Sequence, residues 1–199
     1  MTKIVVLISG NGSNLQAIID ACIKGDIDGQ VSAVISNRAD AFGLQRAQKA
    51  NIPTHVKSHT DFSDRESFDQ AVMSIIDDYQ PDIIVLAGYM RILTDGFVNH
   101  YLGKMINIHP SLLPKYPGLH THQRAIEAGD NEHGSSVHFV TPELDSGPII
   151  EQAKVVIEAH DCPQSLLAKV QKAEHILYPK VVQDIIAGRV VWQGMKQKA

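Results

Sequence analysis

The chain has 199 residues, of which 44% are hydrophobic and 20% are charged, and this balance excludes an intrinsically disordered protein. Its formal net charge of −4 argues against a non-specific nucleic-acid binder, which needs a basic face. Cys22 and Cys162 form neither a disulfide framework nor a C-x-x-C motif and indicate reduced thiols. The first apolar run is too short for a signal peptide, and no run is long enough to span a membrane. We therefore expect a cytoplasmic protein with no nucleic-acid or membrane partner.

Apolar β-branched segments alternate with amphipathic segments in the first half of the chain. The apolar runs predict strands at residues 4–9, 31–36, 52–56 and 83–87, the third of them weakened by Pro53. The helical spacing of apolar residues predicts helices at residues 14–24, 42–50 and 65–79. This alternation is typical of βαβ units and a parallel sheet, whose ligands bind outside the carboxyl ends of the strands.

The second half follows a different pattern. It predicts strands at residues 104–108, 135–140 and 149–157, and helices at residues 119–129 and 163–187. The loop 141–148 is too short for a helical crossover, so the two strands that it joins should be antiparallel. Pro179 predicts a kink or break in the last helix, and residues 189–192 predict a final edge strand. We expect one domain over residues 1–199 with a three-layer α/β fold, in which a mixed, mostly parallel sheet has a Rossmann-like N-terminal half and antiparallel C-terminal strands.

A glycine-rich loop, Ser9-Gly-Asn-Gly-Ser-Asn14, follows the first strand and opens the first helix. Glycines let a backbone approach a ligand closely, and a helix N-terminus offers free N–H groups to an anion. A phosphate site is therefore expected here. The dinucleotide fingerprint G-x-G-x-x-G fails because position 15 is Leu, and no Walker A sequence is present. The alternative is a tight strand–helix turn with Ser13 or Asn14 as the N-cap.

Asn107 and His109 lie at the end of the strand 104–108 and should project to the same side, since strand side chains alternate. An amide can donate to a developing oxyanion and an imidazole can move a proton, so this pair fits acyl-transfer chemistry. The loop between the two antiparallel strands adds Asp145, whose carboxylate could hold an imidazolium in place. The alternatives are a structural histidine and a turn aspartate that binds backbone N–H groups. Sequence spacing does not show whether Asp145 and His109 meet.

Several motifs together resemble the formyltetrahydrofolate-dependent formyltransferase superfamily. Three of them are Asn107-Ile-His-Pro-Ser-Leu-Leu-Pro114, Gly134-x-x-Val-His138 and Leu144-Asp145-x-Gly147-Pro148. Four further similar segments are Ser9–Asn14, Leu86–Leu93, Lys115–His122 and Gln171-x-x-Glu174-His175. The resemblance covers nearly the whole chain and is greatest to members that act in purine synthesis. It implies transfer of the formyl group of 10-formyltetrahydrofolate to the amine of 5-phosphoribosylglycinamide. We expect no metal, and a monomer or homodimer.

The resemblance also implies roles for individual residues. Asn107 would hold the formyl oxygen, and His109 paired with Asp145 would protonate the departing folate nitrogen. The acceptor substrate would be bound by Gly12, Ser13, Asn14, Gln171 and Glu174. The folate would be bound by Arg65, Met90, Arg91, Ile92, Leu93, Asn107, Val140, Thr141, Pro142, Glu143 and Asp145. Leu113-Pro114 is similar to a position that is cis in the family.

Other readings of the same residues remain open at this point. His120 and His122 could suggest a metal pair, but no third ligand stands at a fixed spacing. His138 is expected to be a hydrogen-bonded core histidine or one that supports the site from behind. A formyltetrahydrofolate hydrolase would share Asn107, His109 and Asp145 but use water as the acceptor. A transfer-RNA formyltransferase, a metal-dependent hydrolase and a non-catalytic nucleotide-binding module are the further alternatives.

Overall fold

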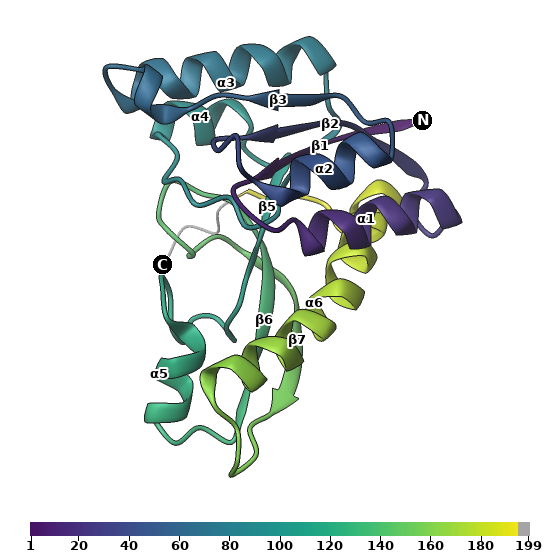
Figure 1. Cartoon of the computed structure of the whole chain (residues 1–199). Coiled ribbons are helices and arrows are strands. Elements are labelled where there is room, and N and C mark those ends of the chain that lie inside the picture. The colour runs from purple at the N-terminus through teal and green to yellow at the C-terminus, as the bar shows by residue number, and fades with distance from the viewer. Residues whose placement is uncertain (195–199) are drawn as a thin grey trace.

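A computed structural model describes residues 1–194. Figure 1 shows a twisted sheet with helices on both faces. The strands are β1 (Thr2–Ile8), β2 (Gly29–Ser36), β3 (Thr54–Val56), β4 (Ile83–Leu86), β5 (Met105–His109), β6 (Glu132–Phe139) and β7 (Ile149–Val156). The helices are α1 (Ser13–Lys24), α2 (Phe42–Lys49), the 3-10 helix η1 (His59–Asp61), α3 (Arg65–Tyr79), α4 (Asp95–His100), α5 (Thr121–Glu127) and α6 (Pro163–Ile186).

The seven described strands form one sheet in the order β3-β2-β1-β4-β5-β6-β7. The five strands from β3 to β5 are parallel to their neighbours, whereas β6 runs antiparallel to both β5 and β7. This is the mixed, mostly parallel α/β sheet that the sequence predicts. The strand order reverses between β1 and β4, and a ligand crevice forms at such a switch point, outside the carboxyl ends of the strands.

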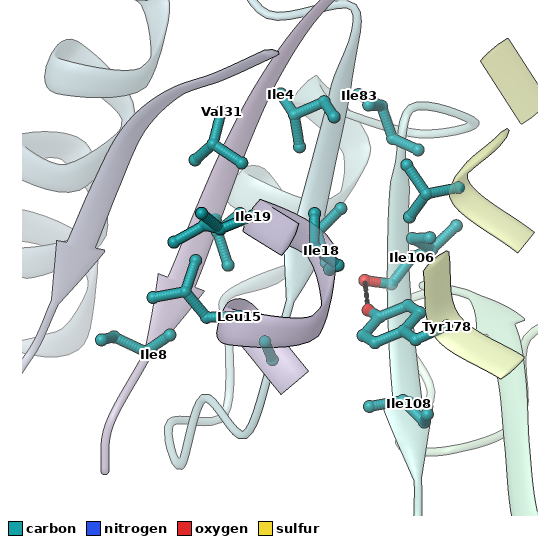
Figure 2. Packing of buried hydrophobic residues seen from close by; sticks show 14 of the residues in the cluster. Ile4, Ile8, Leu15, Ile18, Ile19, Val31, Ile83, Ile106, Ile108 and Tyr178 are labelled. Carbon is teal, nitrogen blue, oxygen red and sulfur yellow. Dashed lines mark hydrogen bonds between the residues drawn. The ribbon is translucent and has the colours of Figure 1, made fainter. Parts of the chain in front are cut away.

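Two apolar clusters cover the two faces of the sheet. One joins the sheet to α1, α2 and α6, and the other joins it to α3 and α4, as the layers in Figure 1 show. In Figure 2, side chains of α1 point at Ile4 and Ile8 of β1, while Tyr178 of α6 reaches Ile106 of β5. The hydroxyl of Tyr178 donates to the carbonyls of Leu86 (2.8 Å) and Ile106 (3.3 Å). These buried bonds fix α6 against β4 and β5.

The predicted edge strand at residues 189–192 is wrong. These residues follow α6 as irregular chain. Trp192 packs edge-on against Phe139, with ring centroids 5.2 Å apart, and lies over Gly103, where a Cβ would approach it to 2.8 Å. The indole therefore covers the core instead of extending the sheet, whose outer strands in the described residues are β3 and β7.

The helices differ from the sequence prediction at several points. α6 continues through Pro179, so the proline does not end it. α5 begins two residues later than predicted, because His120 adopts a left-handed backbone (φ 57) before it. α4 was not predicted, although Thr94 caps it by accepting from the N–H of Phe97 (3.3 Å).

No helix within residues 1–194 combines the length and apolar character that a membrane span requires.

Candidate active site

The loop between β1 and α1 leaves the first turn of the helix uncapped. Gly12, in a left-handed conformation (φ 73), is the N-cap, and no side chain within the described residues caps the helix. The alternative of Ser13 or Asn14 as N-cap is therefore wrong. The N–H groups of a first helical turn have no partner inside the helix. Here they remain free for an anion at the carboxyl end of β1.

Gly12 is required by packing as well as by its backbone angle. A Cβ on Gly12 would lie 2.6 Å from the Cα of Gly43 in α2, and the N–H of Gly43 donates to the carbonyl of Gly10 (3.0 Å). Arg46 of α2 donates to the carbonyl (2.9 Å) and the side-chain oxygen (3.0 Å) of Asn11. Sequence reasoning missed this arginine, because only the fold brings α2 against the loop.

Asn14 is connected to the far end of the chain through Glu174. Its Nδ2 donates to Oε2 of Glu174 (2.9 Å), and the hydroxyl of Ser135 lies 2.8 Å from both Oε1 of Glu174 and the carbonyl of His109. Glu174 is buried, whereas Gln171 lies exposed one helical turn earlier. Oδ1 of Asn14 is buried and has no hydrogen-bond partner among residues 1–194. An orphaned buried acceptor at this place can accept from a ligand.

Asn107 is oriented by His138 of the adjacent strand. Nδ1 of His138 lies 2.9 Å from the carbonyl oxygen of Phe139. Because a carbonyl oxygen can only accept a hydrogen bond, Nδ1 carries the proton. Burial lowers the pKa of His138 and keeps the ring neutral. Nε2 then accepts from Nδ2 of Asn107 (3.3 Å). His138 is thus the supporting histidine that the sequence indicates, and it fixes the direction of the Asn107 amide.

His109 and Asp145 meet, which sequence spacing alone did not show. Nδ1 of His109 lies 3.5 Å from Oδ2 of Asp145, and each side chain is 8% exposed. Nε2 of His109 donates to the carbonyl of Tyr116 (2.8 Å), so each N–H of a protonated His109 faces an acceptor. Oδ1 of Asp145 lies 3.9 Å from Nε2 of His138. Asn107, His138, Asp145 and His109 therefore form one continuous polar cluster at the end of β5.

Left-handed backbone conformations surround this cluster. Asp145 has φ 49 and Tyr116 has φ 54, both unusual for residues other than glycine. The Leu113–Pro114 bond is cis, in agreement with the family resemblance. The N–H of Gly118 donates to Oδ2 of Asp145 (2.9 Å). Strained conformations of this kind concentrate at functional sites, where surrounding contacts hold them in place.

The residues predicted to bind folate lie on two loops beside the cluster. Arg65 opens α3 and donates to the carbonyl of Ile92 (3.2 Å), which brings two of these residues together. Met90 and Ile92 are 69% and 62% exposed. Leu93 is half-buried in the core, and the Arg91 guanidinium stacks over Phe68 at 5.5 Å.

The second of these loops follows β6. Val140 packs on the core and Thr141 is buried, while Pro142 and Glu143 are exposed. Leu144, which the folate prediction omitted, is 58% exposed. Like Met90 and Ile92, it is a large apolar side chain left open to solvent, and this exposure is visible only in the structure.

The remaining histidines do not gather as a metal centre in the described residues. His122 and His133 bond to each other (3.1 Å), and His120 is exposed. Burial lowers the pKa of His133 to about 4. The potential metal-ligand group found within residues 1–194 is Glu158, His160 and Asp161, whose two carboxylates already bind Lys169 (2.9 and 2.7 Å).

A groove of about 720 Å³ runs between α1 and α6. It begins beside Ser13 and Arg46 and continues along charged residues of both helices, and His109 is not among the residues that line it. The polar cluster and the uncapped helix, not this groove, define the site.

Comparisons with known proteins identify the family of the chain. Residues 2–182 match the family model described as formyl transferase. Over 188 residues the chain is 59% identical to the phosphoribosylglycinamide formyltransferase of Escherichia coli K12, covering 94% of this chain and 89% of that protein. It is 43% identical to the human trifunctional purine biosynthetic protein adenosine-3, with 94% of this chain covering 19% of that protein.

Solved structures give the same result. The phosphoribosylglycinamide formyltransferase of Coxiella burnetii superposes with a TM-score of 0.94 at 55% identity, covering 97% of this chain and 90% of that one. The glycinamide ribonucleotide transformylase 1 of Symbiobacterium toebii superposes with a TM-score of 0.95 at 42% identity, covering 98% and 92%. The chain belongs to the formyl transferase family.

Proposed function

We propose that this enzyme transfers the formyl group of 10-formyltetrahydrofolate to the amine of 5-phosphoribosylglycinamide, giving formylglycinamide ribonucleotide and tetrahydrofolate in purine biosynthesis. The observation that carries the proposal is the partly buried cluster of Asn107, His109 and Asp145, assembled from two segments beside the uncapped N-terminus of α1. The names of relatives such as the Escherichia coli protein support it.

The acceptor end of the site is the β1–α1 loop. The free N–H groups after Gly12 would bind the substrate phosphate, together with Ser13 and Asn14. Glu174, which already accepts from Asn14, would accept from the ribose hydroxyls, with Gln171 beside it on α6. The orphaned Oδ1 of Asn14 would take a hydrogen bond that the bound substrate provides.

The folate end lies on the opposite side of the cluster. The residues present fit a ligand with an aromatic pterin and a glutamate tail, because exposed apolar side chains stand beside two cations. Met90–Leu93 and the loop Val140–Asp145 would enclose the pterin, and Arg65 would attract the glutamate carboxylates. Nε of Arg91 is buried without a partner among the described residues, which supports a polar ligand group there.

When bound, 10-formyltetrahydrofolate supplies the formyl carbon. The acceptor amine forms a bond to that carbon, the bond from the carbon to the folate nitrogen breaks, the amine loses a proton and the folate nitrogen gains one. Asn107 would donate through Nδ2 to the formyl oxygen as negative charge develops there. His109 would move the proton at Nδ1, because Nε2 is held by the carbonyl of Tyr116, while Asp145 faces the ring and compensates the positive charge. The chain needs no nucleophilic side chain, because the acceptor is itself an amine.

We also propose that residues 1–199 form a single formyltransferase domain, cytoplasmic and monomeric or homodimeric, that works without a metal. The uninterrupted sheet from β3 to β7 supports one domain. Activity that survives treatment with a chelator would agree with metal independence, whereas activity restored only by added metal would contradict it.

An assay of tetrahydrofolate release tests the main proposal. Release should require 5-phosphoribosylglycinamide and should match formylated product mole for mole. Release at the same rate without the acceptor would instead indicate a hydrolase that uses water.

A further inference from the structure

We infer that Asp130 is a positioning residue for formyl transfer: through the hydroxyl of Tyr116 it holds the segment 115–118, whose backbone orients both His109 and Asp145. The inference rests on the proposed function and adds residues that neither the motifs nor the relatives assign. It follows from contacts that join a turn after α5 to the catalytic cluster.

The segment 115–118 touches both members of the His109–Asp145 pair. The carbonyl of Tyr116 accepts from Nε2 of His109 (2.8 Å), and the N–H of Gly118 donates to Oδ2 of Asp145 (2.9 Å). One short stretch of backbone thus sets the angle of the imidazole and the position of the carboxylate. A shift of this stretch would move both groups together.

The conformation of Tyr116 needs external support. Its φ of 54 is unfavourable for a residue with a Cβ, yet this backbone conformation places the carbonyl toward His109. Such conformations persist where neighbouring contacts hold them. The support must come from contacts of the side chain and of the surrounding loop.

Those contacts converge on Asp130 and Arg124. The hydroxyl of Tyr116 donates to Oδ2 of Asp130 (2.8 Å). The guanidinium of Arg124 lies over the Tyr116 ring at 5.2 Å and donates to the carbonyl of Pro117 (2.7 Å). Lys115 donates to both oxygens of Asp130 (2.9 Å each). The segment is therefore tied to the end of α5 at three consecutive residues.

The hydrogen bond between Tyr116 and Asp130 is the contact that a single substitution removes with least change to the rest of the segment, because Tyr116→Phe takes away only the hydroxyl. Its partner Asp130 is largely covered, with 19% of the side chain exposed, whereas the Lys115 side chain is 59% exposed and its ion pair is weakened by solvent. The hydrogen bond to Asp130 raises the pKa of the Tyr116 phenol, and Lys115 lowers the pKa of Asp130. Asp130 thus accepts as a carboxylate and Tyr116 donates as a phenol.

The experiment compares Tyr116→Phe and Asp130→Ala with the parent in steady-state formyl transfer. Either change should lower kcat by roughly 10- to 100-fold, since displacement of catalytic groups by about 1 Å has an effect of this order. KM for both substrates should stay near the parent value, because neither residue lies at a proposed binding surface. The double variant should be no slower than Asp130→Ala alone, since Asp130→Ala already removes the bond that Tyr116→Phe removes.

The chain offers a matched control in Tyr101→Phe. The Tyr101 hydroxyl donates to Oδ1 of Asp77 at the same 2.8 Å, between α3 and the end of α4. Loss of that bond should leave kcat unchanged. Asp130→Asn keeps an oxygen that accepts from Tyr116 and should restore most of the kcat lost in Asp130→Ala, and this rescue would not follow from a general structural role.

A second measurement keeps the test independent of stability. NMR of the histidine side chains in nitrogen-labelled parent protein should show a hydrogen-bonded Nε2–H for His109. This Nε2–H signal should shift or disappear in Tyr116→Phe. Parent kcat and an unchanged His109 signal in both Tyr116→Phe and Asp130→Ala would overturn the inference. If His109→Ala also kept the parent kcat, the proposed function of the site would fail instead.

Discussion

The loop after β1 and the cluster at the end of β5 serve one site but are built differently. The loop presents backbone N–H groups from an uncapped helix, shaped by Gly12 against Gly43. The cluster presents side chains that hold one another, with Asn107 against His138 and Asp145 facing His109. The loop therefore depends on backbone conformation, and the cluster depends on the identity of single side chains.

This difference predicts separate kinetic effects. Substitutions in the cluster should lower kcat, because they remove groups that we propose to act on the reacting atoms. Substitutions at the loop should raise KM for the phosphorylated acceptor or reduce stability. Glu174 and Ser135 join the two regions, since Ser135 contacts both Glu174 and the backbone of His109.

The largest effect should come from Asn107→Ala. Loss of an oxyanion donor lowers rates by about 10²–10³ in comparable enzymes, and we expect at least that loss in kcat with little change in KM. Steady-state formyl transfer measures it. An Asn107→Ala enzyme within a few-fold of the parent would show that the amide does not act on the formyl oxygen.

Glu174→Gln should affect the junction between the two regions. The carboxylate is buried and accepts from Asn14 and Ser135, and hydrogen bonds to a charged group contribute about 1.5–3 kcal/mol each. Loss of one such bond should raise KM for 5-phosphoribosylglycinamide about tenfold or more, with a smaller change in kcat.

Glu127→Gln is the matched control for that change. Its carboxylate accepts from Gln123 on the exposed surface of α5, so the substitution should leave KM unchanged. A Glu174→Gln enzyme that loses kcat and keeps KM would assign Glu174 to the cluster instead of the acceptor site.

Gly12→Ala tests whether the loop depends on backbone conformation. The left-handed φ and the contact with Gly43 should both disfavour a methyl group, and the free energy of unfolding should fall by about 1–3 kcal/mol. Gly10→Ala is the control, since among residues 1–194 no atom outside its own chain neighbours lies within 4 Å of its Cβ position, and it should stay within about 0.5 kcal/mol. Equal unfolding free energies for the two variants in urea denaturation would contradict this account of the loop.

The smallest effect concerns pH. Burial and the neighbouring His122 lower the pKa of His133 from 6.5 to about 4 in the folded protein. Between these values the unfolded chain binds more protons than the folded one, so stability should decrease as the pH falls from about 6.5 to about 4. His133→Asn should make this dependence less steep, and His160→Asn, at an exposed position, should not. Parallel pH curves of unfolding free energy for the parent and His133→Asn would refute the assignment.

The sequence predicts the parallel half of the fold well for a physical reason. Strands buried on both faces read as continuous apolar runs, as in Ile4–Ile8 and Ile83–Leu86, and the segments between them repeat with helical spacing. α4 escaped prediction because a helix of six residues has too few turns to show a period. The strand expected at residues 189–192 does not form, because Trp192 packs against the core.

The site was predictable only in part. Asn107 and His109 share a strand, so their proximity follows from alternation. The approach of Asp145 depends on a tight loop in which Asp145 is left-handed and Gly147 has no room for a Cβ against the Phe139 carbonyl. The contacts of Tyr116 with His109 and Asp130 depend on the fold around α5, which no periodicity encodes.

Asp145→Asn tests the central claim most directly, because it keeps an oxygen that can accept from Gly118 and removes only the negative charge that faces His109. Steady-state formyl transfer with 5-phosphoribosylglycinamide is the measurement. The account predicts that kcat falls at least about tenfold, with KM for both substrates near the parent value and tetrahydrofolate release still dependent on the acceptor. A kcat equal to that of the parent would contradict the claim that Asp145 and His109 act as a pair.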